Sequence, residues 1–226
     1  MADTSGLRRR GISMLPEGWR YAKLGSIANV RTGIAKGKSS LRSQKLLPYL
    51  RVANVQDGYL DLREIKQIEV ESDQIERYSL KAGDILMTEG GDFDKLGRGT
   101  VWLGQIEPCL HQNHVFAVRV NPEIVDPYYL AALSASEYGR SYFLGCAKRS
   151  TNLASINSSQ LKEFPVLLPP IAEQRRVTTI LSCWDEAINA SAIHTERLRT
   201  EKAALMSDLL TGKRRVRLPE AEEATP

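Results

Sequence analysis

Between Leu15 and about Leu168, hydrophobic residues occur in short runs rather than in long helical stripes. Runs of four to eight apolar or alternating residues are separated by Gly, Pro, Asn and Asp, which favour turns. The pattern predicts strands over residues 49–56, 59–62, 65–70, 84–88, 99–103 and 114–120. Asp57 and Gly58 lie between the first two and predict a hairpin turn, because both residues tolerate a positive φ. This part of the chain is therefore expected to be rich in strands.

Two segments within this region carry helix signals instead. Ser72 and Asp73 supply a cap for a helix over residues 72–78. Asp126 followed by Pro127 supplies an N-cap and a proline at the first helical position, so a second helix is expected to begin there. Strands interrupted by helices predict an α+β fold for this region.

The pattern changes after Pro169 and Pro170. No Gly or Pro occurs in the 41 residues before Gly212. This stretch predicts one helix about 60 Å long, at a rise of 1.5 Å per residue. Apolar residues follow an alternating spacing of four and three, which is typical of a coiled-coil seam. The ten seam positions are Val177, Leu181, Trp184, Ile188, Ser191, Thr195, Leu198, Lys202, Leu205 and Leu209.

The seam predicts pairing with another helix. Seven of its ten positions are apolar, and burying them would contribute on the order of 10–20 kcal/mol before costs are subtracted. A single helix in water gains none of this free energy. The polar positions Ser191, Thr195 and Lys202 would restrict register and oligomeric state. The alternative is a helix packed flat on its own domain, because balanced charges off the seam are also typical of a solvated helix face. Gly212 is expected to end the helix as its C′ residue.

Composition narrows the class of protein. Hydrophobic residues make up 42% and charged residues 26% of the chain, as in an average soluble globular protein. The sequence contains no run of eighteen apolar residues, the length that would predict a membrane span. A cytoplasmic location without a membrane partner is therefore expected. Three cysteines, without CxxC spacing, argue against a disulfide scaffold. Residues 1–14 predict a flexible leader, and residues 213–226, basic and then acidic, predict a disordered tail.

The net charge of +4 is too small to diagnose a polyanionic partner, but the charge is unevenly distributed. Residues 31–56 contain no Asp or Glu, and their six basic residues are Arg31, Lys36, Lys38, Arg42, Lys45 and Arg51. Glycines and serines among them predict a mobile loop suited to following phosphates. Arg51, Asn54 and Gln56 on the expected strand suit base reading, because Arg pairs with guanine and Asn or Gln pairs with adenine.

Three further polar segments have the same hydrogen-bonding capacity. In the loop over residues 88–99, an acidic side chain suits cytosine N4, while a basic one suits phosphate or guanine. The expected contacts there are Thr88, Glu89, Asp92, Lys95 and Arg98. The other two segments supply Gln112, Asn113 and His114, and Arg149 and Asn152. Ordinary solvated surface loops explain all of these segments as well, so both interpretations stay open.

Enzymatic and metal-binding patterns are weak. A zinc site would draw on Cys109, His111, His114 and Cys146, but their spacing matches no closed site. Asp57, Glu64 and Lys66 faintly match a Mg²⁺-dependent nuclease, although a hairpin with surface charges explains them better. Residues 126–129 lack the second proline of the DPPY motif of adenine methyltransferases. We therefore expect no catalytic residue, no metal and no cofactor on this chain.

Five segments carry a family resemblance. They are LPEGW at 15–19 followed by Leu24-Gly25, YLRVANV at 49–55, LKAGDIL at 80–86, FPVLLPPIAEQ at 164–174 and LLTG at 209–212. In this order they resemble the DNA-specificity (S) subunit of type I restriction-modification enzymes, and the LPPxxEQ segment before the long helix is the most telling. The resemblance implies a DNA target-recognition domain over residues 15–168 and a spacer helix over residues 169–212.

The resemblance also implies a function. The common form of this family has two such units in tandem, whereas this sequence has one and resembles a half subunit or a fragment that needs another half. The family would bind double-stranded DNA and dock methyltransferase (M) subunits, with restriction (R) subunits as a further partner. Two copies paired through their helices would read a symmetric, interrupted site. S-adenosylmethionine is expected only on the methyltransferase partner. The alternative is a coiled-coil protein-interaction module without DNA specificity.

Overall fold

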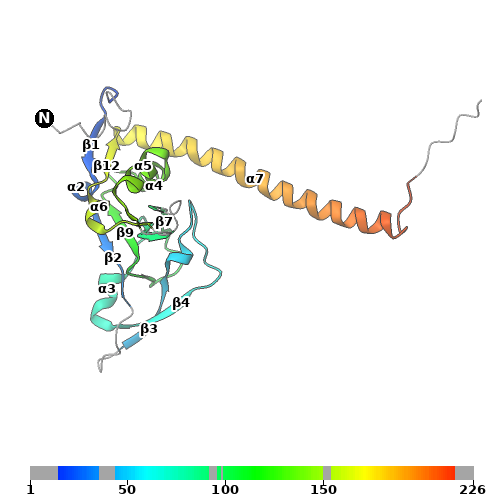
Figure 1. Ribbon diagram of the computed structural model, residues 1–226, viewed down its shortest axis with the longest axis horizontal. Helices are drawn as coiled ribbons and strands as arrows, with labels where there is room; N and C mark the ends of the chain where they lie inside the picture. The colour runs from blue at the N-terminus through cyan, green and yellow to red at the C-terminus, as the bar shows by residue number, and fades with distance from the viewer. Residues whose placement is uncertain (1–14, 36–43, 92–95, 98, 150–153, 217–226) are drawn as a thin grey trace, which may run out of the picture. The chain divides into compact units, whose positions relative to one another are not determined.

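The computed structural model describes residues 15–35, 44–91, 96–97, 99–149 and 154–216. The chain separates into two compact units, residues 1–178 and 179–226. The first unit contains all of the sheets, and the second contains most of one long helix (Figure 1).

A four-stranded antiparallel sheet lies at the centre of the first unit. Its strand order is β2 (Ala28–Thr32), β9 (Val115–Val120), β5 (Ile85–Thr88) and β7 (Gly99–Val101). All four residues of β5 are buried. Ile85 and Met87 pack in one hydrophobic cluster and Leu86 in another, because successive side chains of a strand point to opposite faces of its sheet. The sheet is therefore covered on both faces.

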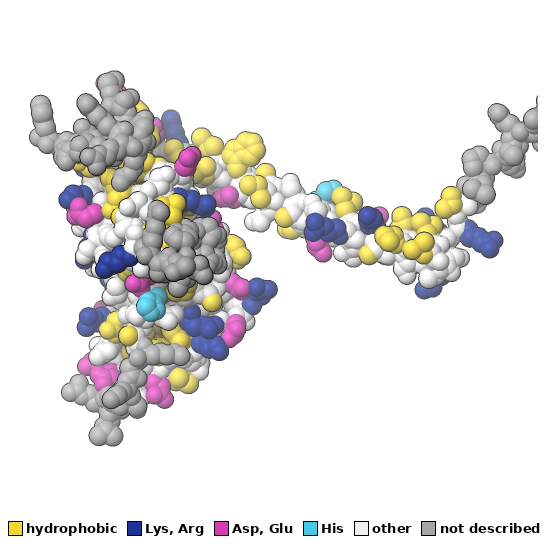
Figure 2. All heavy atoms as spheres, in the orientation of Figure 1, with side chains coloured by type: hydrophobic (Ala, Val, Ile, Leu, Met, Phe, Trp, Pro, Cys, Tyr) yellow, Lys and Arg dark blue, Asp and Glu magenta, His cyan; other side chains and the backbone are white. Residues whose placement is uncertain are grey.

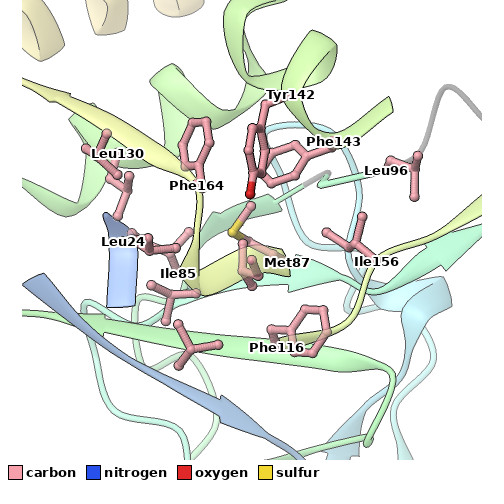
Figure 3. Close-up of a cluster of buried hydrophobic side chains, with 14 of the residues drawn as sticks. Leu24, Ile85, Met87, Leu96, Phe116, Leu130, Tyr142, Phe143, Ile156 and Phe164 are labelled. Atoms are coloured by element: carbon pink, nitrogen blue, oxygen red, sulfur yellow. The ribbon is translucent and has the colours of Figure 1, made fainter. Parts of the chain in front are cut away.

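Helices and aromatic rings cover one face of this sheet. The helices are α4 (Pro127–Ala135), α5 (Glu137–Cys146) and α6 (Ser158–Lys162), and β12 (Pro165–Leu168) follows them. Phe164 lies with its ring centroid 5.2 Å from that of Tyr142 and 5.0 Å from that of Phe143. Figure 3 shows these rings facing Ile85 and Met87 of the sheet. Side chains distant in sequence thus share one core.

A second, three-stranded sheet has the order β4 (Lys66–Glu71), β3 (Gln44–Leu50) and β8 (Leu110–His111). Strands β3 and β4 are antiparallel, whereas β3 and β8 are parallel. The helical segment predicted after β4 is present as η2 (Ser72–Gln74) and α3 (Ile75–Tyr78). A further small sheet has the order β10 (Lys148–Arg149), β11 (Ala154–Ser155) and β6 (Gly90–Gly91).

One part of the strand prediction is wrong. The strand expected over residues 49–56 ends at Leu50, and η1 (Val52–Asn54), a short 3₁₀ helix, follows it. Residues 59–62 form no strand. Only the bridge between Val55 and Leu60 remains of the expected hairpin around Gly58, whose φ is +80°. Side-chain hydrogen bonds replace strand pairing here, as described below.

The long helix is α7 (Ile171–Leu210), and its 40 residues confirm the helix predicted after the two prolines. Gly212 follows it with a φ of +73°, which confirms the predicted C′ position. The first turns of α7 belong to the first unit, where β1 (Arg20–Lys23) pairs with β12 and leads into α2 (Leu24–Ile27). No helix in the described part of the chain is long and apolar enough to span a membrane.

Candidate nucleic-acid interface

The turn Gln112–His114, between β8 and β9, is the point where the candidate segments meet. Gln112 N donates to Leu50 O at 2.9 Å, just before Arg51. Asn113 N donates to Ile34 O at 3.0 Å, two residues after the end of β2. Glu89 N donates to His114 O at 3.0 Å, just after β5. The two ends of segment 31–56 and the start of loop 88–99 therefore share one backbone turn.

The fourth candidate segment joins this group through the small sheet. Gly90 and Gly91 of β6 pair with Ser155 and Ala154 of β11, which in turn pairs with Lys148 and Arg149 of β10. A Cβ atom on Gly90 would lie 2.4 Å from Ala154 O. This glycine is therefore needed for the close approach of two strands.

Gly33 has the same role next to the turn. A Cβ atom built on it would lie 1.9 Å from His111 O, and the residue is buried. The sequence suggested that such glycines make segment 31–56 mobile. At this position glycine instead allows the backbone just after β2 to pack against the strand that leads into the turn.

Glu89, His114 and Asn113 form a hydrogen-bonded chain on this surface. His114 Nδ1 lies 2.6 Å from Glu89 Oε2, and Asn113 Nδ2 lies 3.3 Å from His114 Nε2. His114 remains 54% exposed at its side chain and Glu89 31% exposed. These three predicted contacts are therefore close together and accessible to a ligand.

Asn54 does not fit the predicted base-reading role. It is 3% exposed, and its Nδ2 donates to Asp61 O at 2.8 Å and to Glu64 O at 2.9 Å. Its Oδ1 accepts from Arg51 N at 2.9 Å. These three hydrogen bonds hold the loop after β3. They also satisfy the buried amide, which would destabilise the folded chain if it had no partners. Gln56 is half-buried and donates from Nε2 to Ala53 O at 2.8 Å.

Two other predicted contacts are also buried or engaged. Thr88 is 2% exposed and belongs to the core of β5, so it does not fit a DNA contact. Arg31 is half-buried and donates from Nη2 to the backbone oxygens of Arg77 and Ser79. Burial lowers the pKa of Arg31, and the nearby Arg119 lowers it further. Only part of the Arg31 guanidinium is accessible to phosphate.

Arg51 is partly available. Its Nη2 lies 3.5 Å from Glu64 Oε1, and 27% of its side chain is exposed. Its buried Nε has no hydrogen-bond partner among the described residues. Figure 2 shows basic and acidic side chains intermingled on one face of the first unit rather than a uniformly basic patch.

The side chains of the other eight predicted contacts are not among those that the structure describes. Lys36, Lys38, Arg42, Asp92, Lys95, Arg98 and Asn152 lie outside the described residues. For Arg149 only the backbone in β10 is described.

Buried polar groups also lie inside the first unit. Asp84 is 1% exposed and accepts two hydrogen bonds of 2.6 Å from Arg119. His111 is fully buried, and its Nδ1 lies 2.7 Å from Val115 O, while Nε2 has no partner among the described residues. Burial lowers the pKa of His111 to about 4, so the ring is neutral near pH 7.

The weak enzymatic patterns form no site in the described part of the chain. No group of three His, Cys, Asp or Glu side chains in these residues is placed to hold a metal. Asp57 Oδ2 pairs with Arg140 Nη2 at 2.5 Å, and Glu64 pairs with Lys66 at 3.2 Å. Burial raises the pKa of the Cys109 thiol to about 12, which makes it a poor metal ligand.

Sequence reasoning missed the residue that anchors the start of α7. Gln174 is fully buried, and its Nε2 donates to Pro169 O at 2.9 Å and to Ile124 O at 3.1 Å. Its Oε1 accepts from Asp126 N at 2.9 Å. The neighbouring Glu173 accepts from Trp19 Nε1 at 3.2 Å. The available signal was the glutamine that ends the LPPxxEQ segment, in the first turn of the predicted helix.

Along α7 the predicted seam is exposed. The exposed fractions are 41% for Leu181, 67% for Trp184, 63% for Ile188, 51% for Leu198, 40% for Leu205 and 38% for Leu209. Val177 is half-buried. Figure 2 shows hydrophobic side chains along the helix surface.

Comparison with known proteins identifies the family. The family model for the type I restriction modification DNA specificity domain matches residues 16–197, and the chain belongs to this family. It is 29% identical over 207 residues to the putative type I restriction enzyme MjaX specificity subunit of Methanocaldococcus jannaschii, which covers 90% of this chain and 48% of that protein. It is 26% identical over 175 residues to the EcoKI specificity subunit of Escherichia coli K12, covering 72% of this chain and 37% of that protein. The chain thus spans about half, or less, of the length of these relatives.

Solved structures confirm the α+β fold. The HsdS subunit from Thermoanaerobacter tengcongensis has a TM-score of 0.61 and 17% identity, over 87% of this chain and 49% of that one. A chain from a study of complex assembly and conformational transition of the type I R-M system has a TM-score of 0.58 and 20% identity, over 91% and 49%. These structures show the fold, and the family model confirms the family resemblance seen in the sequence.

Proposed function

We propose that this chain is a non-catalytic, sequence-specific DNA-binding subunit of a type I restriction-modification system. The first unit reads one half of a bipartite site in double-stranded DNA, and the chemistry belongs to methyltransferase subunits that dock on it. Membership of the specificity family supports this proposal. So do the names of the relatives, which are specificity subunits rather than methyltransferases or nucleases.

One structural observation carries the proposal. Four polar segments, far apart in sequence, meet at the turn Gln112–His114 and at the small sheet beside it. A surface built from several short loops on rigid strands can contact several successive base pairs at once, and such loops vary without disturbing the scaffold. Among the described side chains, those proposed to contact DNA are Arg31, Arg51, Gln56, Glu89, Gln112, Asn113 and His114.

The proposal also draws on residues whose side chains lie outside the described part of the chain. The basic residues Lys36, Lys38, Arg42, Lys95 and Arg98 are proposed to meet phosphates, and Asp92, Arg149 and Asn152 to complete the surface. Asn54 and Thr88 are left out because they are buried.

Salt dependence tests the DNA-binding role. The preferred target is selected from a randomised duplex pool, and its affinity is measured by fluorescence anisotropy at increasing salt. If five or six basic residues neutralise phosphates, the plot of log affinity against log salt should have a slope of about −5. Lys36→Gln with Lys38→Gln should make the slope shallower by about two.

A matched lysine provides the control. Lys23 is exposed and pairs with Glu163 at 2.6 Å, so Lys23→Gln should leave the slope unchanged. A slope near zero for the wild-type chain, or no preference for any sequence over random duplex, would contradict the proposal.

The exposed seam of α7 supports a second role. We propose that two copies pair through Val177, Leu181, Trp184, Ile188, Leu198, Leu205 and Leu209, and that the resulting homodimer reads a symmetric, interrupted site. Methyltransferase subunits, and restriction subunits as a further partner, would assemble on this dimer. S-adenosylmethionine would bind to the methyltransferase and not to this chain.

The same seam favours the rival function, a coiled-coil interaction module without DNA specificity. The two proposals predict different results when the chain selects targets from the randomised duplex pool. A module that binds only protein enriches no DNA sequence, although it still pairs through α7.

A further inference from the structure

Glu89 and His114 face each other because of the register of the central sheet. Thr88 of β5 pairs with Val115 of β9, so Glu89 and His114 are the next residues on the two strands. Directly opposed residues of antiparallel strands have their Cβ atoms about 4.5–5.5 Å apart. This geometry brings the carboxylate within 2.6 Å of the imidazole.

The backbones that carry this chain of side chains are fixed. Glu89 N donates to His114 O at 3.0 Å, and Glu89 O accepts from Ile156 N at 2.8 Å. Asn113 N donates to Ile34 O at 3.0 Å. The residues just inside the pair, Thr88 and Val115, are buried. The three polar side chains therefore extend from a rigid base, which is what a precise contact to a ligand requires.

Hydrogen-bond polarity follows from the contacts. An ionised carboxylate only accepts, so His114 Nδ1 must carry the proton that it donates to Glu89 Oε2. An amide nitrogen only donates, so the 3.3 Å contact with Asn113 Nδ2 makes Nε2 the acceptor. The amide of Asn113 is thereby oriented with its nitrogen toward His114. Among the described residues, its oxygen, its second N–H and Glu89 Oε1 have no partner.

These remaining groups match a particular part of DNA. In the major groove, the hydrogen-bond donors on the bases are the amino groups at adenine N6 and cytosine N4. A carboxylate is repelled by phosphates and by the oxygens of guanine and thymine, so Glu89 Oε1 suits an amino group. An amide that offers both an oxygen and an N–H matches adenine, which presents N6–H as a donor and N7 as an acceptor.

We propose that Asn113 reads one adenine of the target, and that His114 and Glu89 are positioning residues that hold its amide in the reading orientation. Glu89 Oε1 accepts from the amino group of a neighbouring adenine or cytosine. This inference rests on the proposed DNA-binding function and adds the base and the residues that select it.

Selection from a randomised duplex pool by the full chain tests the inference. The wild-type motif should contain an adenine whose preference over other bases falls roughly 10- to 100-fold in Asn113→Ala, the range expected for loss of one bidentate contact. His114→Phe and Glu89→Leu should reduce the same preference, because the amide is then free to rotate. The salt dependence of binding should stay unchanged in all three, since none of them is proposed to contact phosphate.

Two further variants separate positioning from a merely structural role. Glu89→Gln should keep the adenine preference that Glu89→Leu loses, because its amide oxygen still accepts from His114 Nδ1. Asn121 follows β9 at the opposite end from His114 and caps a turn through Glu123 N. Asn121→Ala should therefore leave the motif intact. Equal unfolding temperatures of the exposed-site variants would verify that the domain stays folded.

The outcomes distinguish this inference from the proposed function. A wild-type chain that selects a motif, with Asn113→Ala or His114→Phe changing no single position in it, overturns the inference and leaves the function standing. Equal motifs for Glu89→Gln and Glu89→Leu overturn the positioning role. A wild-type chain that selects no sequence overturns both.

Discussion

The two units of this chain differ in how far their apolar side chains are buried. In the first unit, large apolar residues form three clusters in which Leu50, Ile85 and Phe164 have no exposed surface. In the second unit, Trp184 and Ile188 are more than 60% exposed. The first unit therefore contains the contacts that stabilise it, whereas the helix in the second unit gains stability from apolar burial only when it meets a partner. If the helix pairs as proposed, its stability depends on concentration, whereas that of the first unit does not.

The largest expected effect is on the helix. Leu198→Lys with Leu205→Lys places two charges on the seam, and we expect the proposed dimer to dissociate completely to monomers at micromolar concentration, because buried unpaired charges are strongly unfavourable. Light scattering measures the mass. Thr200→Lys with Ala204→Lys, two exposed positions off the seam, should leave the dimer intact. An unchanged mass in the seam variant would show that pairing occurs elsewhere.

The next largest expected effect is a loss of stability in the first unit alone. Phe164→Ala removes a fully buried ring that lies 5.0–5.2 Å from two neighbouring rings. The free energy of unfolding of the first unit should fall by about 3–5 kcal/mol. Circular dichroism should show its transition at lower temperature, while the dimer mass by light scattering stays the same. Simultaneous loss of the dimer would mean that the two units do not separate in stability.

A smaller effect depends on pH. Burial lowers the pKa of His111 from 6.5 to about 4. Between these pH values the His111 side chain is protonated in the unfolded chain and neutral in the folded chain. Stability is present above pH 6.5 and is lost across this window, by about 2–3 kcal/mol at pH 4.5. Denaturant unfolding of the first unit at pH 7 and pH 4.5 measures it. His111→Gln, which can still donate to Val115 O, should remove this part of the pH dependence, and parallel curves for the two proteins would contradict the assignment.

The sequence predicted elements that depend on local signals. The range of α7 followed from the absence of Gly and Pro, and the start of α4 followed from Asp126 and Pro127. Strands over 65–70, 84–88 and 114–120 were found within a residue or two, since their apolar patterns are strong. The resemblance to the specificity family was also available from short motifs, and the family comparison confirmed it.

The parts that were not predicted depend on long-range contacts. Asn54 and Asn113 are both asparagines in polar segments. The amide of Asn54 forms hydrogen bonds with three backbone groups, whereas Asn113 lies at an accessible turn. Nothing local distinguishes them. The meeting of the candidate segments depends on the parallel pairing of β3 with β8 and on the bridge between Ile34 and Gln112, neither of which leaves a pattern in the sequence.

The buried amide of Gln174 constrains how this protein can be recombined with relatives. The two prolines before α7 are the obvious place in the sequence to join one recognition domain to another helix. A junction there would separate Gln174 from Ile124 O and from the N–H of Asp126, its partners upstream of the prolines. Chimeras that exchange the whole segment up to Thr178 keep the Gln174 amide together with its hydrogen-bond partners, and their recognition domain should stay folded.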